Sequence, residues 1–289
     1  MRGLLWLLAV EFLCHISTTT ASAPKVALHF SEAQNVRKLQ RNNGMQNLDR
    51  QLRQLGISLA ASTEGQPRLT GLDAPNAYII PAQSGPYPST HGMLEVSSYV
   101  AAGGLVIIVG AASGEGQETR TFVASALNYN GNWKPCERNG TSEKARRRSG
   151  TPVVSEHAYS FLMGDDYDDN AWPLTLEDVH VLTTLTRCEH EDPRAVAIPL
   201  YTLMGDDNKV AVQAFMRAGN PGAVVWLGYS WRDGPQERWG FLLHKLITDF
   251  ALRDGRSAAE APPATPSLGD LLTPLAASTP DPSRGPSAV

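Results

Sequence analysis

The chain has 289 residues, of which 42% are hydrophobic and 19% charged, and its formal net charge at pH 7 is −4. This composition is that of an ordinary globular protein and fits one large domain, or one domain with an insertion. The acidic balance, with no evident basic face, argues against nucleic acid as a partner.

The first residues predict a secretory signal. A basic start at Arg2 precedes an apolar run, Leu4 to Leu13, that is too short to cross a bilayer as a helix. The small-residue triplet Ala21-Ser22-Ala23 follows, which is typical of a cleavage site. We therefore expect residues 1–23 to be removed, the mature protein to be secreted, and the chain to make no stable membrane insertion.

The mature chain begins with strand-like and helix-like segments in alternation. The most hydrophobic run, Leu105 to Val109, has the short length and composition expected of a parallel strand that is covered on both faces. Leucines at 48, 52 and 55 predict a helix that Gly56 ends, and Gly103-Gly104 stops a second helix that begins near Ser89 or Thr90. Further strands are expected at 25–30, 57–61 and 76–81, and a further helix at 121–127. This alternation indicates a doubly wound sheet.

Residues 130–192 lose this rhythm and are expected to be a loop-rich insertion. They contain Cys136 and Cys188, the two cysteines that are left once the signal, which holds Cys14, is removed. In an oxidising compartment such a pair predicts a disulfide bond. The sequon Asn139-Gly140-Thr141 predicts a glycan on Asn139.

Regular structure returns in three apolar segments, 195–201, 209–215 and 223–228, of which the last two predict a β-hairpin. A helix follows, and its expected buried face consists of Trp239, Leu242, Leu243, Leu246 and Phe250. Residues 255–289 are rich in Pro, Ala and Ser and bury too little apolar surface to offset their ordering entropy, so we expect a disordered tail. The main domain is therefore expected at residues 24–254.

Two stretches resemble the class I glutamine amidotransferase-like superfamily. Residues 76–110 (NAYIIPAQSGPYPSTHGMLEVSSYVAAGGLVIIVG) are similar to the strand, the helix ending in Gly-Gly and the elbow strand of those domains. Residues 219–247 (GNPGAVVWLGYSWRDGPQERWGFLLHKLI) are similar to their closing hairpin and final helix. The resemblance covers most of residues 24–254 and implies a flavodoxin-like α/β fold with a mostly parallel sheet and a C-terminal hairpin.

The resemblance implies that any chemistry would occur at the tight strand-to-helix turn after Val109, which we call the elbow. Catalytic members carry Gly-x-Cys-x-Gly there, and a nearby histidine activates the thiol. The matching residues are Gly110-Ala111-Ala112-Ser113-Gly114, so Ala112 stands at the nucleophile position. Ser113 is one position out of place for a serine elbow. The family's His-Pro-Glu is absent as well, because Tyr229-Ser230-Trp231-Arg232 stands in that neighbourhood. The sequence therefore predicts a non-catalytic member.

A ligand is expected at the carboxyl edge of the sheet, where open α/β sheets have their crevice. The candidate residues stand in the turns after the strands: Ser84, Gly85, Gly110, Ala112, Ser113, Tyr229, Trp231 and Asp233. An aromatic pair with a carboxylate, such as Tyr229 and Trp231 with Asp233, can stack on a sugar and bind its hydroxyls. The alternative is that Trp231 covers the edge of the core.

No cofactor and no metal are expected. The run Asp165 to Asn170 lacks the glycine and the glutamate of an EF-hand loop, and the stretch Cys188 to Asp192 has no second His or Cys at a zinc spacing. His29 and His91, near the carboxyl edge, are interpreted as packed or solvated histidines.

The sequence therefore predicts a secreted or cell-surface, non-catalytic binding or structural module, with a carbohydrate or another small molecule as its ligand. The alternative is an extracellular hydrolase acting on a carbohydrate or an ester, with Ser113 and either His29 or His91 as its catalytic pair.

Overall fold

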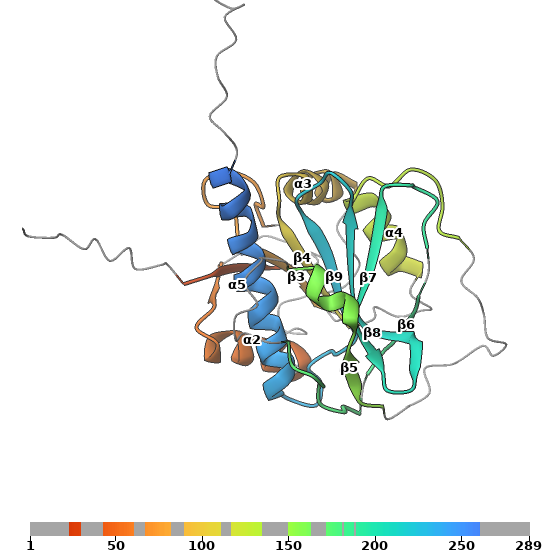
Figure 1. Ribbon diagram of the computed structural model, residues 1–289. Helices are drawn as coiled ribbons and strands as arrows, with labels where there is room; N and C mark the ends of the chain where they lie inside the picture. Colours follow the sequence, from red (N-terminus) through yellow and green to blue (C-terminus); the bar gives the residue numbers. More distant parts are fainter. Residues whose placement is uncertain are drawn as a thin grey trace, which may run out of the picture.

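A nine-stranded mixed sheet runs through the protein. Figure 1 shows the computed structural model. The structure describes residues 23–29, 43–60, 67–81, 90–110, 117–134, 150–162, 172–180, 182–187 and 189–260. Statements about the fold and the site refer to these ranges.

Five strands form a parallel half-sheet in the order β2-β1-β3-β4-β9. They are β1 (Lys25–Leu28), β2 (Ser58–Leu59), β3 (Ala77–Pro81), β4 (Leu105–Val109) and β9 (Ala223–Leu227). This is the flavodoxin-like order 2-1-3-4-5 with β9 as the fifth strand, and the direction of winding reverses between β1 and β3. The doubly wound α/β fold expected from the sequence is confirmed.

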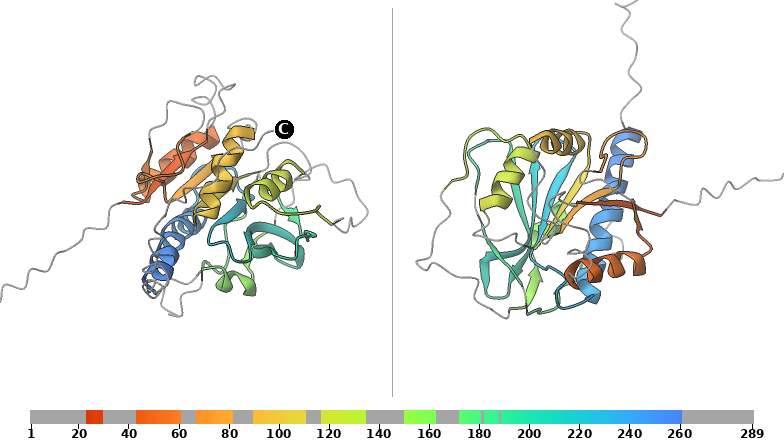
Figure 2. Two further views of the ribbon diagram at one scale, coloured as in Figure 1. Left: turned by 90° about the horizontal axis from the view of Figure 1, so that it is seen from above. Right: turned by 180° about the vertical axis from the view of Figure 1, so that it is seen from behind.

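Helices cover both faces of the parallel half. The helices α2 (Asn43–Gln54) and α5 (Glu237–Glu260) pack on one face, while α3 (Thr90–Ala101) and α4 (Gln117–Ala126) pack on the other, as the views from two sides show (Figures 1 and 2). Successive strand residues point to opposite faces, so β3, β4 and β9 are apolar along their whole length.

Three of the helices end in the same way. Gly56 after α2 and Gly103 after α3 have positive φ angles of 71° and 100°, and Asn128 takes the corresponding place after α4 with φ 50°. The next residue in each case donates its N–H to a carbonyl five residues back: Ile57 to Leu52, Gly104 to Tyr99, and Tyr129 to Ala124. These are Schellman motifs, and the left-handed position explains the Gly or Asn.

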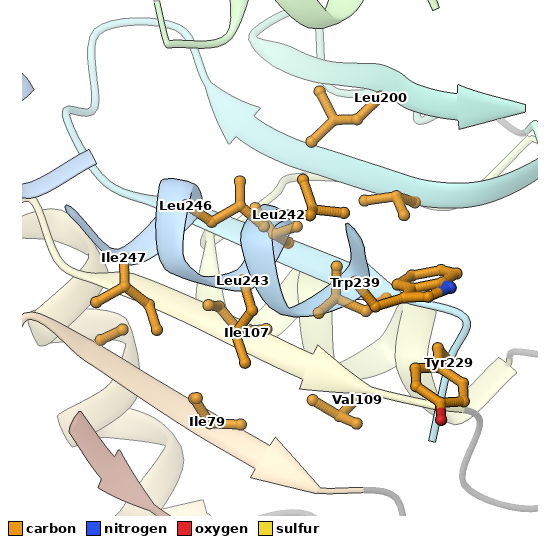
Figure 3. Packing of buried hydrophobic residues seen from close by; sticks show 14 of the residues in the cluster. Ile79, Ile107, Val109, Leu200, Tyr229, Trp239, Leu242, Leu243, Leu246 and Ile247 are labelled. Atoms are coloured by element: carbon orange, nitrogen blue, oxygen red, sulfur yellow. The ribbon is translucent and has the colours of Figure 1, made fainter. Parts of the chain in front are cut away.

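The larger core lies between α5 and the sheet. The side chains of Leu242, Leu243, Leu246 and Ile247 belong to one buried cluster with Ile107 of β4, and Leu243 lies next to Ile107 in Figure 3. The expected buried face of this helix is confirmed, because Trp239, Leu242, Leu243, Leu246 and Phe250 are each at most 1% exposed. Burial of each such side chain contributes about 1.5–3 kcal/mol to stability.

The other half of the sheet is antiparallel and larger than the single hairpin expected. The predicted hairpin of β8 (Asp206–Arg217) and β9 is present, but β7 (Ala195–Leu203) also pairs with β8 across a two-residue turn, Met204-Gly205. Gly205, the second of the two turn residues, has φ 80°, a conformation that favours glycine at this turn position. The sequence does not predict this pairing, because the polar residues 205–208 indicate a longer loop.

Residues 130–192 do not form a separate unit in the part that the structure describes. β5 (Pro152–Val154) pairs with the outer edge of β7, β6 (Leu185–Thr186) pairs with β8, and the 3-10 helix η1 (Glu156–Ser160) lies against β7. The segments around Trp133 and His190 also meet as an antiparallel bridge. The expected insertion is therefore an extension of the main sheet.

Helix α5 continues past the expected domain boundary to Glu260. The sequence predicts that residues 255–260 belong to the disordered tail, but Arg256, Ala258, Ala259 and Glu260 favour a helix, and the first proline of this segment is Pro262. The rest of the tail, 261–289, lies outside the described residues. Among the described helices, none combines the length and the hydropathy that a membrane-spanning helix needs.

Candidate functional site

The carboxyl edge of the parallel half-sheet is where the fold places a ligand crevice, at the reversal between β1 and β3. His29, directly after β1, lies here. Its Nδ1 is 2.6 Å from Oη of Tyr78 on β3, and the two rings meet edge to face with centroids 6.0 Å apart. His29 is only 3% exposed. The structure therefore places it as a packed histidine with one ring nitrogen already engaged, while the side chain of His91 lies outside the described residues.

The elbow begins as the resemblance implies. Gly110 follows β4 with φ 73°, a conformation that favours glycine. Its N–H donates to the carbonyl of Leu227, 2.7 Å away, and its carbonyl accepts from the indole Nε1 of Trp226 at 3.2 Å. These bonds fix the end of β4 against β9. Four of the predicted site residues, Ser84, Gly85, Ala112 and Ser113, lie outside the described residues.

Tyr229 and Trp231 lie in the core, which is the second of the two roles that the sequence left open for Trp231. Both are fully buried, with ring centroids 4.8 Å apart, and Tyr229 also packs on Trp239 of α5 at 5.2 Å. Burial raises the pKa of the Tyr229 phenol, whose hydroxyl donates to the carbonyl of Gly234. Neither ring offers an open face to a sugar, so of the expected trio only Asp233 is exposed.

Trp231 is held by α2 rather than by a ligand. Its indole Nε1 donates to Oε1 of Gln51 at 2.9 Å, and its carbonyl accepts from Nδ2 of Asn47 at 2.9 Å. Its φ of 58° is unusual for a residue other than glycine. The physical reason for the burial is that α2 and α5 together cover the turn after β9, and no local sequence pattern contains that information.

Cys136, Cys188, Asn139 and the acidic run 165–170 lie outside the described residues. Lys134, two positions before Cys136, and Glu189, directly after Cys188, are described and lie side by side. Lys134 donates its N–H to the carbonyl of Glu189 at 2.9 Å, and its Nζ lies 2.8 Å from the Glu189 carboxylate. In the part of the chain that the structure covers, no three His, Cys, Asp or Glu side chains form a metal-binding group.

A polar pocket that the sequence did not predict lies at the opposite, amino edge of the sheet. We call it the amino-edge pocket. It has a volume of about 310 Å³ and is lined by Tyr129, Trp133, Arg187, Glu189, His190, Asp192, Pro193, Ala195 and Ala197. A second hollow of about 680 Å³ adjoins it along α4 and shares Tyr129, Trp133 and His190 with it. The sequence signal for this pocket is the pair Tyr129 and Trp133 in an Asn/Gly-rich turn. Because this turn has no fixed spacing to residues 188–192, the sequence does not show that the two segments meet.

No protein-family model matches the chain, and no curated protein is similar to it in sequence. Solved structures with a similar arrangement include a ThuA-like protein from Bacteroides uniformis, with 11% identity, a TM-score of 0.43, and coverage of 81% of this chain and 94% of that one. A glutamine amidotransferase from Thermotoga maritima has 11% identity, a TM-score of 0.34, and coverage of 83% and 86%. An exo-β-1,4-mannosidase from Opitutaceae bacterium strain TAV5 has 12% identity and a TM-score of 0.42 over 82% of this chain but only 36% of that one.

Proposed function

We propose that this protein is a secreted, non-catalytic binding module built on an amidotransferase-like α/β domain. The observation that carries the proposal is at the elbow. Gly110, directly after the central strand β4, has the positive φ that the tight turn needs, yet Ala112 occupies the position of the nucleophile. A methyl group has no electron pair with which to attack a carbonyl carbon.

The second half of the resembled catalytic pair is replaced by packing. The turn after β9 carries Tyr229 and Trp231, both buried, where catalytic relatives have a histidine. Both catalytic positions therefore carry residues that cannot catalyse the reaction, while the fold is kept. This supports a binding role rather than an enzymatic one. The sequence features at the N-terminus, the Cys136 and Cys188 pair, and the sequon at Asn139 support secretion.

The alternative, a hydrolase that uses Ser113 with His29, is supported less well by the geometry. A catalytic histidine needs one ring nitrogen to take the proton of the nucleophile and the other to be held by an orienting group. In His29 the Nδ1 contact to Tyr78 fills the orienting role, but the ring is 3% exposed at the end of β1. Such a ring offers little access to a substrate.

The test is a set of hydrolysis assays on the purified secreted protein. Ammonia release from glutamine and the cleavage of 4-nitrophenyl esters and glycosides are measured against a buffer blank. The proposal predicts rates equal to the blank. A rate above the blank that Ser113→Ala or His29→Gln abolishes would establish the hydrolase and overturn the proposal.

A further inference from the structure

We propose that the amino-edge pocket binds a neutral, polyhydroxylated ligand, a sugar residue, against the aromatic wall of Trp133 and Tyr129. The pocket lies at the other end of the strands from the elbow: β7 begins here at Ala195, which pairs with Arg217, and the neighbouring β8 residue Met216 pairs with Ala223 at the start of β9. The inference therefore does not depend on what the elbow does.

The aromatic wall is built by the end of α4. The Schellman turn at Asn128 directs the chain so that Tyr129 packs on the His190 ring at 4.7 Å between centroids, and its hydroxyl donates to the carbonyl of Met216 at 2.7 Å. Trp133 meets the same His190 ring edge to face at 4.9 Å. Its indole Nε1 is fixed by the carbonyl of Arg120. The wall is thus rigid before any ligand arrives, which lowers the entropic cost of binding.

The charges around the pocket are of both signs and lie close to one another. Arg187, which also lines the pocket, is close enough to Glu189 that its charge, after that of Lys134, lowers the pKa of this carboxyl. Glu189 lies 2.8 Å from Nζ of Lys134, and Asp192 lies 3.3 Å from Arg217. Asp192 also accepts the backbone N–H groups of Asn130 and Arg194 at 2.8 Å each, and these bonds hold the pKa of its carboxyl below its usual value. Where charges of opposite sign lie close together, their electrostatic potentials largely cancel, but their oxygen atoms and N–H groups can still form hydrogen bonds. The pocket therefore favours a neutral polar ligand.

His190 is a buried polar side chain behind the aromatic wall. Its Nδ1 accepts the N–H of Asp192 at 3.0 Å, so its neutral ring carries the proton on Nε2. The side chain is 9% exposed and lines both hollows, yet Nε2 has no hydrogen-bond acceptor among the residues that the structure describes. Buried donors are nearly always satisfied. Nε2 itself has almost no accessible surface, so this donor lies behind the pocket wall, and the aromatic rings rather than this N–H carry the proposal.

The floor of the pocket is open because β7 places small side chains there. Ala195 and Ala197 point to the pocket, while Val196 between them points to the opposite face of the strand. A volume of about 310 Å³ is at the lower end of the range of roughly 300–1,000 Å³ found for ligand sites. It suits one sugar ring, and the adjoining hollow along α4 offers room for a second.

The experiment titrates the purified secreted protein with D-glucose, D-galactose, D-mannose and N-acetylglucosamine, and with their methyl β-glycosides, by saturation-transfer difference NMR. Saturable binding to at least one of them is expected. Ala195→Leu fills the pocket without removing a polar group and is expected to weaken that binding at least about tenfold. The matched control Val196→Leu enlarges the opposite face of the same strand and should change the affinity less than about twofold.

Three results would overturn the proposal. The first is that no sugar of the panel binds saturably. The second is that Ala195→Leu binds as tightly as the unmodified protein, or that Val196→Leu loses binding equally. The third is that glucose 6-phosphate binds more tightly than glucose, because that order requires a site for an anion.

Discussion

The indole Nε1 of Trp231 donates a hydrogen bond to Oε1 of Gln51, 2.9 Å away and 180 positions earlier in the chain. The same oxygen accepts the N–H of Gln236 at 3.1 Å. One amide side chain on α2 therefore satisfies two donors of the turn that leads from β9 into α5. These two hydrogen bonds fix the turn after β9 against α2, so that Trp231 forms part of the hydrophobic core.

This relationship makes Gln51 a structural residue. Gln51→Met keeps the approximate volume but leaves two buried donors without an acceptor, and it should lower the free energy of unfolding by about 1–3 kcal/mol. Gln54→Met, at an exposed position of the same helix, should change it by less than about 0.5 kcal/mol. Urea denaturation followed by tryptophan fluorescence measures both. Equal stability of the two variants would show that the bonds to Gln51 contribute nothing.

Stability should also depend on the protonation of His190. Burial lowers the pKa of His190 in the folded state, and this outweighs the opposite effect of Asp192 and Glu191. Between this lowered pKa and about 6.5, the unfolded chain binds more protons than the folded one, so stability rises with pH in that window. The contribution of the neutral His190 side chain to the free energy of unfolding is complete above about pH 6.5 and is lost as the pH falls from about 6.5 to the lowered pKa.

The variant His190→Asn tests this dependence, because Asn keeps an acceptor near the position of Nδ1 but does not titrate. The free energy of unfolding of the unmodified protein, minus that of the variant, should decrease as the pH is lowered from 7.5 to 5. A difference that stays constant or increases would contradict the assignment of a lowered pKa to His190.

We predict a disulfide bond between Cys136 and Cys188. The antiparallel contact of Lys134 with Glu189 brings the two flanking segments together within a few residues of both cysteines. A bond that closes a loop of about 50 residues should contribute roughly 3–4 kcal/mol in the chain-entropy model. Labelling of the native, unreduced protein with a thiol reagent should leave both cysteines unmodified, and two labelled thiols would exclude the bond.

Asn139 should carry a glycan when the protein is made in a eukaryotic secretory pathway. Enzymatic deglycosylation is expected to reduce the intact mass, and Thr141→Ala, which destroys the sequon but retains the asparagine, should abolish the mass difference. An unchanged mass on treatment of the unmodified protein would show that the sequon is not used, and it would weaken the case for secretion.

The parallel half of the fold could be predicted because its information is local. Leu105–Val109 is a buried strand from composition alone, and Gly56 and Gly103 mark helix ends through the left-handed conformation that they adopt. The antiparallel half could not be predicted to the same extent. Short strands such as β5 and β6 form only because they pair with β7 and β8, and these partner strands come later in the chain.

The site was harder to predict than the fold for the same reason. Tyr229 and Trp231 have the residue types of a sugar-stacking pair, and only the position of α2 decides that they are buried. The amino-edge pocket combines the end of α4, the start of β7 and the segment around His190. No spacing rule joins three segments that meet only through the sheet.

The central claim is that the protein binds a ligand without converting it. The most direct measurement incubates the purified protein at stoichiometric concentration with the sugar that binds best, presented as its methyl β-glycoside, and analyses the ligand by mass spectrometry over a day. The account predicts that NMR detects the bound ligand and that all of it is recovered at its original mass. Release of methanol and free sugar, in proportion to the protein present, would contradict the account.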